Sequence, residues 1–418
     1  MKKQNKQNRQ KIAVSMLVVG GLVSPFAYAT NGDEMMAVGS QSTALGGTGV
    51  ANFIGAESTW ANPAMLGKSK GKEVTGGVNL FKPKVTNTGV MNAGAGDSTA
   101  DTSYIPDLSY SNRIDNSLTY GVAMGGIAGM GVNYTDASAS LGLVKAKSAL
   151  SILRIVPTIA YNTNEYGVGF SPVFQYGSLM LSYNNFNGTS GGPYNTDQKK
   201  DTSTSFGFVL GGYYNATSAV TVAAAYQSKF AGKYGTQISG AGAGFGLCTG
   251  GPCAGAPFSD NLDQPAQIKL GVAYAVADSL TLTADYKSIQ WGSAAGYKDF
   301  GWMDQTVIAV GAKYTANGYW LGLGYNHADD PIGVLADNTY RNAAINIFNN
   351  MFFPAIVTNS YTFGGGYDIS NALAVEGAAV ITPEVKKTVA ISSMGAPAAT
   401  NTTTHSQKAY EVSLRYKF

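Results

Sequence analysis

The chain is short of charge, histidine and cysteine. Charged residues make up 13% of its 418 positions, whereas a soluble globular domain has roughly a quarter. Its two histidines, His327 and His405, lie far apart, and neither has a cysteine near it, so no histidine–cysteine metal site is predicted. A hydrolase that needs a histidine beside its nucleophile is equally hard to build. The sequence therefore predicts no enzyme, no metal ion and no cofactor.

No run of 18 apolar residues occurs after residue 29, and this absence excludes membrane-spanning helices. The start of the chain differs. Residues 1–11 carry five cations and no acid, residues 12–26 are largely apolar, and Ala27-Tyr28-Ala29 has the small-residue form of a signal-peptidase site. This order is typical of a secretory signal peptide. We expect residues 1–29 to be removed by cleavage after Ala29.

Loss of the signal peptide changes the charge balance. It removes five of the 28 lysines and arginines and leaves 23 of them against 25 acidic residues, a net charge of −2. The formal charge of +3 on the whole chain is therefore no sign of a basic surface, and no nucleic-acid partner is predicted.

The only cysteines are Cys248 and Cys253. In an exported protein such a close pair predicts a disulfide within a loop. A redox or metal-binding pair is the alternative, but four residues separate the two cysteines instead of two, and no histidine lies nearby.

Strict alternation of apolar and polar residues marks the end of the chain. A strand places alternate side chains on opposite faces, so the final segment has one apolar and one charged face. The same alternation recurs at 266–277, 280–287 and 319–326 in a chain with 53 glycines and 25 tyrosines. These features favour an outer-membrane barrel whose apolar face meets lipid. The apolar positions of the final segment are Tyr410, Val412, Leu414, Tyr416 and Phe418.

Fourteen such segments can be counted, and short and long links alternate between them. Outer-membrane barrels have an even number of antiparallel strands, short periplasmic turns and long outer loops. We therefore predict an all-β fold, a 14-stranded antiparallel transmembrane β-barrel over residues 73–418, in the bacterial outer membrane. The segments start near residues 73, 101, 117, 151, 165, 202, 218, 264, 279, 303, 318, 356, 372 and 407.

Residues 30–72 precede the first strand and do not alternate. They are rich in small residues and are either a disordered leader or a plug inside the barrel. Eight strands already enclose an interior filled by side chains, so a barrel of fourteen needs filling if it is not to leak. The sequence therefore favours an N-terminal hatch that plugs the lumen.

The hatch segment carries the most specific motif, Asn62-Pro63-Ala64, after Gly46-Gly47-Thr48-Gly49. Two later stretches, 265–291 and 323–332, follow in the same order as signatures of a known family. Together they resemble the outer-membrane long-chain fatty acid transporter family, which includes toluene and xylene uptake channels. Met65 departs from that family's pattern, which commonly has glycine there.

The resemblance implies a hatch-plugged barrel that binds hydrophobic small molecules, such as fatty acids, alkanes or arenes, and releases them after the hatch shifts. In this family release can be lateral, at a kink in the third strand. Here Gly125, Gly126 and Gly129 lie in that strand, and glycine within a strand often marks a bend; general glycine richness is the alternative. Further expected partners are outer-membrane lipid and lipopolysaccharide and the barrel-assembly machinery, and the expected state is a monomer.

The outer loop at 342–356 is unusually apolar, and its large side chains recur near helical spacing. Exposed apolar patches tend to mark interaction sites, so these residues are predicted to form an entry surface or the roof of the substrate pocket. Packing of the loop cluster is the alternative. The residues are Ile345, Phe348, Met351, Phe352 and Phe353.

The class of substrate stays open at this point. Lys269 and Lys287 point inward by the alternation and could hold a carboxylate, or they could pair with Asp285 as ordinary lumen charges. A general diffusion porin and a structural or adhesin barrel are the competing functions. Residues 30–72 discriminate, because porins line a constriction with charge from an infolded loop and carry no Asn-Pro-Ala hatch.

Overall fold

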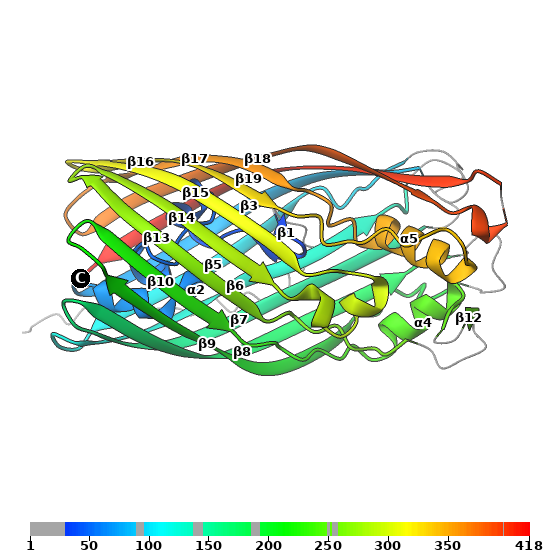
Figure 1. Ribbon diagram of the computed structural model, residues 1–418, viewed down its shortest axis with the longest axis horizontal. Helices are drawn as coiled ribbons and strands as arrows, with labels where there is room; N and C mark the ends of the chain where they lie inside the picture. Colours follow the sequence, from blue (N-terminus) through cyan, green and yellow to red (C-terminus); the bar gives the residue numbers. More distant parts are fainter. Residues whose placement is uncertain are drawn as a thin grey trace, which may run out of the picture.

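The computed structural model describes residues 30–88, 96–136, 145–184, 193–248, 251–252, 258–395 and 397–418. The proposed signal peptide, residues 1–29, lies outside this part of the chain. The described residues form one long cylinder (Figure 1), with the C-terminus at the end that carries the short turns.

Fourteen long strands form the wall, as the alternation predicts. Neighbours along the chain pair antiparallel, and the last strand pairs with the first from Glu73 opposite Lys417 to Asn87 opposite Thr403, which closes the barrel. The strands are β3 (Lys72–Asn87), β5 (Ser103–Arg113), β6 (Leu118–Asn133), β7 (Lys147–Asn162), β8 (Tyr166–Ser182), β9 (Asp201–Asn215), β10 (Val220–Gln227), β13 (Gln267–Ala277), β14 (Leu280–Ile289), β15 (Gln305–Ala316), β16 (Tyr319–Ala328), β17 (Asn359–Asp368), β18 (Leu373–Ala390) and β19 (Thr400–Lys417).

Shorter elements complete the described chain. Three two-residue strands add to the barrel sheet: β1 (Thr30–Asn31), β2 (Glu34–Met35) and β4 (Gly96–Asp97). A separate hairpin consists of β11 (Leu247–Cys248) and β12 (Gly251–Pro252). The helices are α1 (Ser40–Ala44), α2 (Ser58–Ala61), α4 (Gln237–Gly244) and α5 (Tyr340–Phe352), and the 3-10 helices are η1 (Gly55–Glu57), η2 (Pro63–Lys68), η4 (Trp291–Ser293), η5 (Tyr297–Phe300) and η6 (Ser392–Met394). None of the helices in the described ranges is long and apolar enough to cross a membrane.

The two faces of the wall differ as the alternation predicts. In β19 the side chains of Val412 and Leu414 are 55% and 54% exposed, whereas Glu411 and Arg415 are 2% and 3% exposed. The outside is therefore apolar, and the inside is polar and covered by other protein atoms. This is the arrangement of a barrel that meets lipid with its outer face.

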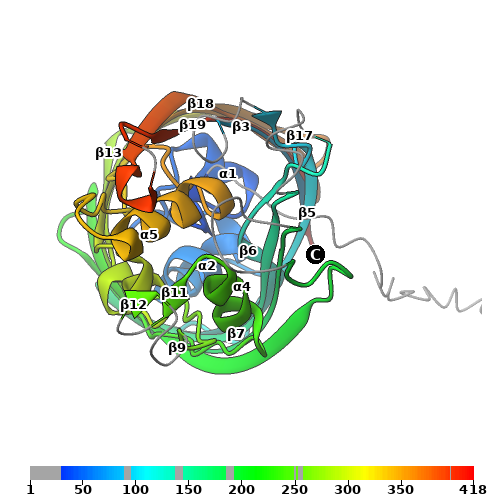
Figure 2. The ribbon, with the colours of Figure 1, turned by 90° about the vertical axis from the view of Figure 1, so that its right-hand side faces the viewer.

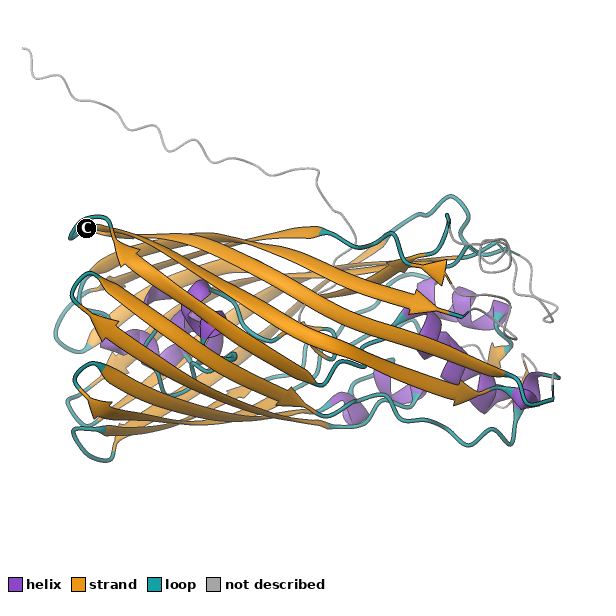
Figure 3. Ribbon diagram, turned by 90° about the horizontal axis from the view of Figure 1, so that it is seen from above, coloured by secondary structure: helices purple, strands orange, loops and turns teal. Residues whose placement is uncertain are grey.

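The two ends of the cylinder also differ. Links of two to four residues join consecutive strands at one end, for example residues 278–279 between β13 and β14. The opposite end carries the long loops, with α4 and α5 labelled in Figure 1 and a group of helices drawn purple at that end in Figure 3. We call these the short-turn end and the long-loop end.

Residues 30–71, the hatch, lie inside the cylinder. Seen along the barrel axis, this segment fills the ring of strands (Figure 2). Most of its residues are buried, including every residue of α1 and η1. The strand that follows, β3, begins at Lys72. The fold is therefore a plugged barrel.

Candidate functional site

The Asn-Pro-Ala motif anchors the hatch to the wall. The Asn62 side chain caps η2 by accepting a hydrogen bond from the Ala64 amide at 3.0 Å, and it donates to the carbonyls of Val50 and Gly212 at 2.8 and 3.2 Å. Wall glycines make room for the motif, because a Cβ at Gly211 would stand 1.9 Å from the Asn62 side-chain oxygen. The motif thus joins two parts of the hatch and the wall through one buried amide.

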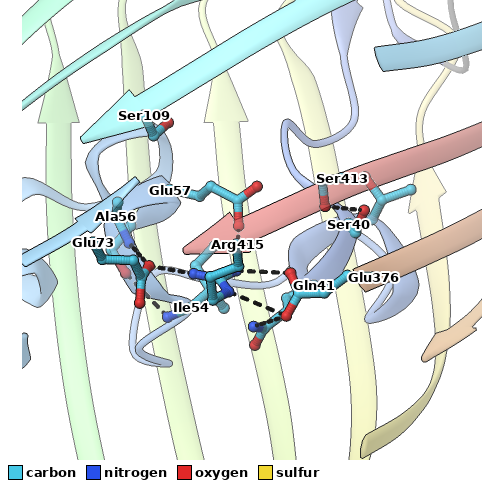
Figure 4. Close-up of polar contacts among 12 residues, drawn as sticks. Ser40, Gln41, Ile54, Ala56, Glu57, Glu73, Ser109, Glu376, Ser413 and Arg415 are labelled. Atoms are coloured by element: carbon cyan, nitrogen blue, oxygen red, sulfur yellow. Dashed lines mark hydrogen bonds and ion pairs between the residues drawn. The ribbon is translucent and has the colours of Figure 1, made fainter. Parts of the chain in front are cut away.

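A buried charge cluster anchors the hatch near the short-turn end (Figure 4). Arg415 of β19 lies 2.7 Å from Glu57 of the hatch and 2.8 Å from Glu376 of β18, and it also pairs with Glu73 of β3. Gln41 in α1 donates to Glu376 at 2.8 Å. One guanidinium therefore ties the hatch to three neighbouring strands.

The first residues of the hatch form part of the wall. Thr30–Asn31 and Glu34–Met35 pair as a tight hairpin, and its turn residue Gly32 has φ +69° with Trp291 packed where a side chain would be, so only glycine fits there without strain. Glu34 pairs with Ala128 of β6, and the Gly129 amide donates to the Asp33 carbonyl at 2.9 Å.

This hairpin occupies a place where two wall strands are not paired. The ladder between β5 and β6 ends at Asp107 opposite Gly125, although both strands continue. We call the unpaired stretch, residues 103–106 of β5 and 126–132 of β6, the seam. On its other side β6 remains paired with β7, with a register shift between Gly126 and Ala128 that leaves Ile127 as a bulge. The register shift lies next to Gly125, Gly126 and Gly129, and the lateral opening expected at these glycines stays a prediction.

A cavity of about 80 Å³ lies directly inside the seam, between the hatch and the wall. Much of its lining is apolar. The apolar contributors include Met36, Val38, Ile54, Trp60, Ile127 and Ile289. The bulged Ile127 is among them, so the irregular part of β6 borders the cavity.

Cations form the polar side of this cavity. Arg154 of β7, Lys269 of β13 and Lys287 of β14 all line it. Asp285 does not pair with the two lysines, because its carboxylate accepts from the hatch amides of Gly49 and Val50 at 2.8 and 3.0 Å. Of the two roles considered for Lys269 and Lys287, pairing with Asp285 is disfavoured, because hatch amides bind the Asp285 carboxylate.

The three cations have few anionic partners within the described chain. Lys269 is 7% exposed and makes no hydrogen bond or ion pair to any described residue. Lys287 donates only to the Met36 carbonyl at 3.2 Å. Arg154 binds Gln175 and Gln227 at 3.0 and 3.1 Å. Within the described chain, Glu34 is the one carboxylate that forms an ion pair with any of them, 3.7 Å from Arg154.

A second buried carboxylate, Asp33, fixes the hairpin toward the long-loop end. It is fully buried and accepts hydrogen bonds from Gln264 at 3.0 Å and from the Tyr297 hydroxyl. Burial raises the pKa of Asp33 to about 7, and the nearby Glu34 carboxylate raises it further, while the hydrogen bonds from Tyr297 and Gln264 oppose the rise. Asp33 therefore gains or loses a proton near neutral pH.

The predicted apolar loop is a helical roof at the long-loop end. Thr339 caps α5 by accepting from the Asn342 amide at 3.2 Å. Ile345, Phe348, Met351 and Phe352 are at most 1% exposed, so they pack the loop cluster and do not form an open entry surface.

Beneath the roof lies a smaller and almost wholly apolar pocket. Phe348 stacks on Phe300 with ring centroids 4.7 Å apart, and Phe353, which is only partly buried, reaches the pocket. Its lining consists of Ile238, Leu262, Tyr297, Phe300, Trp302, Phe348, Asn349 and Phe353.

Other predicted residues are placed away from both pockets or cannot be placed. Cys253 lies outside the described residues, so the disulfide with Cys248 stays a prediction. His405 is buried near Pro354, whose carbonyl lies 2.7 Å from the imidazole Nδ1, and His327 contacts Asn359. In the described ranges no group of three or more histidine, cysteine or acidic side chains is placed to hold a metal ion.

Sequence reasoning missed Arg154 and Glu34. The sequence held one usable signal for Arg154, because it is the only charged residue in the segment 150–160 and alternation places it on the inward face. Glu34 had no comparable signal, because the hatch sequence has no regular alternation that would show which wall residue a side chain faces.

Known proteins share this plugged-barrel architecture. A family model described as outer membrane protein transport protein (OMPP1/FadL/TodX) matches residues 22–418. The crystal structure of the Pseudomonas putida toluene transporter TodX is similar with a TM-score of 0.66 at 18% identity, over 92% of this chain and 99% of that one. A Pseudomonas aeruginosa FadL homologue gives 0.68 at 15% identity, over 93% and 100%. The Ralstonia pickettii toluene transporter TbuX gives 0.62 at 18%, over 92% and 99%. At these identities the structural matches show a shared fold. A search of curated proteins found no match.

Proposed function

Because this chain belongs to the OMPP1/FadL/TodX family of outer membrane transport proteins, we propose that it takes up amphipathic carboxylates with long apolar tails, of which fatty acids are the obvious class. The family is one of transport channels of the bacterial outer membrane. The names of the similar structures include toluene transporters and a FadL homologue, so the choice between neutral hydrocarbon and acid rests on the residues of this chain.

The observation that carries the proposal is the set of cations in the cavity behind the seam. Arg154 and Lys269 are buried to 6% and 7% exposure, and a buried charge without a close partner is costly. A carboxylate bound between them would supply that partner through short charge-assisted hydrogen bonds. An arene or alkane offers no such compensation, and its pocket needs no cation.

The apolar part of the cavity suits the rest of such a molecule. Met36, Val38, Ile54 and Ile289 line it together with Trp60, whose indole nitrogen is held by the Ser109 hydroxyl at 3.2 Å. Apolar burial is worth roughly 25 cal/mol per Å², so each methylene placed against these side chains adds to affinity. A head group and a tail thus have separate subsites.

A route follows from the order of the two pockets. Substrate would enter at the long-loop end, where the pocket under α5 gathers apolar tails from dilute solution. It would then pass to the cavity beside the hatch and leave laterally through the seam once the hairpin of residues 30–35 has moved. The contacts of Glu34 with Ala128 and of Asp33 with Gly129 support this role of the hairpin, because they occupy the seam.

Binding of matched ligands tests the head-group specificity. Purified full-length protein would be titrated with a long-chain carboxylate and with the primary alcohol of the same chain length. We expect the acid to bind at least about tenfold more tightly, because one charge-assisted hydrogen bond is worth about 1.5–3 kcal/mol. The double variant Arg154→Gln, Lys269→Gln should lose this preference and still bind the alcohol.

Lys313→Gln provides the matched control. Lys313 is also a lumen lysine, but it contacts Gln41 and lies over the Trp320 ring, 5.1 Å from its centroid, away from the cavity. The control should keep the preference for the acid. Equal binding of acid and alcohol by the unaltered protein would overturn the proposal and favour a neutral hydrocarbon.

A further inference from the structure

We propose that the Glu34 carboxylate stands in the head-group subsite of the empty channel, and that substrate carboxylate displaces it and thereby unpairs the hatch from the seam. Glu34 is then the residue that makes opening depend on an acidic head group. This inference rests on the proposed function, since it needs a carboxylate as substrate.

The contact between Glu34 and Arg154 is incomplete. Their nearest oxygen and nitrogen are 3.7 Å apart, whereas charge-assisted hydrogen bonds are 2.7–2.9 Å long. Within the described chain the Glu34 Oε1 and Arg154 Nη2 atoms are both buried without a hydrogen bond, and so is the neighbouring Gln227 Nε2. Arg415 differs, because two of its carboxylate contacts are 2.7 and 2.8 Å long.

Hydrogen-bond donors without partners favour replacement of the Glu34 carboxylate by a ligand carboxylate. A ligand carboxylate has two oxygens, and the free donors of Arg154 and Gln227 lie at the same cavity as Lys269. Bound there, it would complete hydrogen bonds that Glu34 leaves unmade. Buried polar groups without partners cost about 1–3 kcal/mol each, so satisfying them gives the ligand an advantage over the intramolecular carboxylate.

The same residue controls the seam through its backbone. Glu34 is the residue of β2 that pairs with Ala128, and the preceding Asp33 carbonyl accepts from Gly129. A second carboxylate beside Glu34 would repel it, because two like charges in one buried site disfavour each other. Movement of the Glu34 side chain out of the subsite therefore pulls on the backbone contacts of Ala128 and Gly129 in β6 with the hatch hairpin.

Hydrogen exchange at the seam measures this coupling. Exchange of the peptide that covers residues 126–132 would be followed in the full-length protein with no ligand, with the long-chain acid and with the matched alcohol. We expect the acid to speed exchange about tenfold, which corresponds to about 1.4 kcal/mol of lost protection, and the alcohol to leave it unchanged. If bound acid leaves the seam amides fully protected, the proposed displacement of Glu34 by the substrate is wrong.

Glu34→Gln tests the residue itself. The glutamine oxygen can still accept from Gln267 as Glu34 does, but the charge is lost. This variant should show fast seam exchange without ligand and a higher affinity for the acid, with alcohol binding unchanged. Glu165→Gln is the control, because it removes an exposed carboxylate from the short turn between β7 and β8 and leaves the hatch and the subsite intact; it should bind acid and alcohol as the unaltered protein does.

The two proposals fail in different ways. Equal affinity of the unaltered protein for acid and alcohol overturns the proposed substrate class. The role of Glu34 alone is overturned if the unaltered protein prefers the acid but the seam amides of Glu34→Gln exchange as slowly as those of the unaltered protein.

Discussion

The Gly129 amide of β6 donates its hydrogen bond to the carbonyl of Asp33 in the hatch, at 2.9 Å. A residue from the plug thus takes the place that the neighbouring strand β5 leaves empty, since the β5–β6 ladder ends at Gly125. The hatch is therefore part of the barrel wall as well as its filling. Changes in the hairpin should be read as changes in the wall.

Docking of the hairpin should depend on pH through Asp33. Burial raises the pKa of Asp33 to about 7, and exposure on undocking would return it to the ordinary value near 3.8. Proton binding therefore favours the docked state. This contribution is complete below about pH 3.8 and is lost as pH rises through about 7. After correction for intrinsic rates, seam exchange should be faster at pH 8 than at pH 5.5. Asp33→Asn, which stays neutral, should abolish this dependence; if it persists there, Asp33 is not its source.

Gly211 and Gly212 offer a matched test of the hatch anchor. A Cβ at Gly211 would stand 1.9 Å from the Asn62 side-chain oxygen, whereas at Gly212 the nearest atom is 3.7 Å away. Gly211→Ala should unseat the motif and cost about 1–3 kcal/mol, as overpacking does, with increased ion conductance in planar bilayers. Gly212→Ala should conduct like the unaltered protein. Equal conductance of the two variants would show that the motif does not hold the plug.

Deletion of Ile127 should close the seam to substrate. It removes the residue that breaks the register between β6 and β7, so the two strands would pair without a bulge and β6 would straighten. Uptake of a radiolabelled long-chain acid by cells should fall, while heat-modifiable migration of the purified barrel stays normal. Deletion of Asp136, in the loop after β6, serves as the control. Undiminished uptake by a folded Ile127 deletion would contradict lateral release.

Arg415→Met should be strongly destabilising. It leaves Glu57, Glu73 and Glu376 buried without their shared cation, and breaking a buried ion pair costs about 3–5 kcal/mol. Urea unfolding in detergent measures the loss. Lys82→Met, at an exposed position, should unfold like the unaltered protein. Adding Glu57→Gln and Glu376→Gln to Arg415→Met should recover part of the stability, and no recovery would mean that charge is not the cause.

Phe353→Ala should weaken capture at the long-loop end with little loss of stability, because this side chain lines the apolar pocket under α5 but is only partly buried. The apparent KM for uptake should rise, and the maximal rate should change little. Phe245→Ala removes a ring from the same loop cluster that does not line this pocket and controls for general loosening. A KM that is unchanged by Phe353→Ala would argue against capture there.

The wall could be predicted because lipid imposes a simple period. Most lipid-facing positions are apolar, and in these two segments the lumen positions between them are small or polar. The alternation at 266–277 and 280–287 therefore corresponds to β13 and β14 within a few residues. The last strand was predicted to start near 407 but begins at Thr400. Residues 400–407 are polar on both faces, so nothing in their pattern separates strand from loop.

The site was harder to predict for a physical reason. Its cations come from β7, β13 and β14, and their facing carboxylate comes from the aperiodic hatch, so no local pattern connects Arg154 to Glu34. The inward direction of Lys269 could be read from parity alone. That Asp285 binds hatch amides instead of a lysine depends on how the plug is seated, which the spacing of residues does not encode.

The contacts of Arg415 have a consequence for biogenesis. Its partners are Glu57 before the first wall strand, Glu73 in that first strand and Glu376 in the strand before the last. The guanidinium itself belongs to the last strand, so the wall residues that bind the plug come together only when the last strand has paired with the first. A nascent barrel therefore cannot lock its plug early, and the step that makes the cylinder continuous is also the step that seals it against leakage.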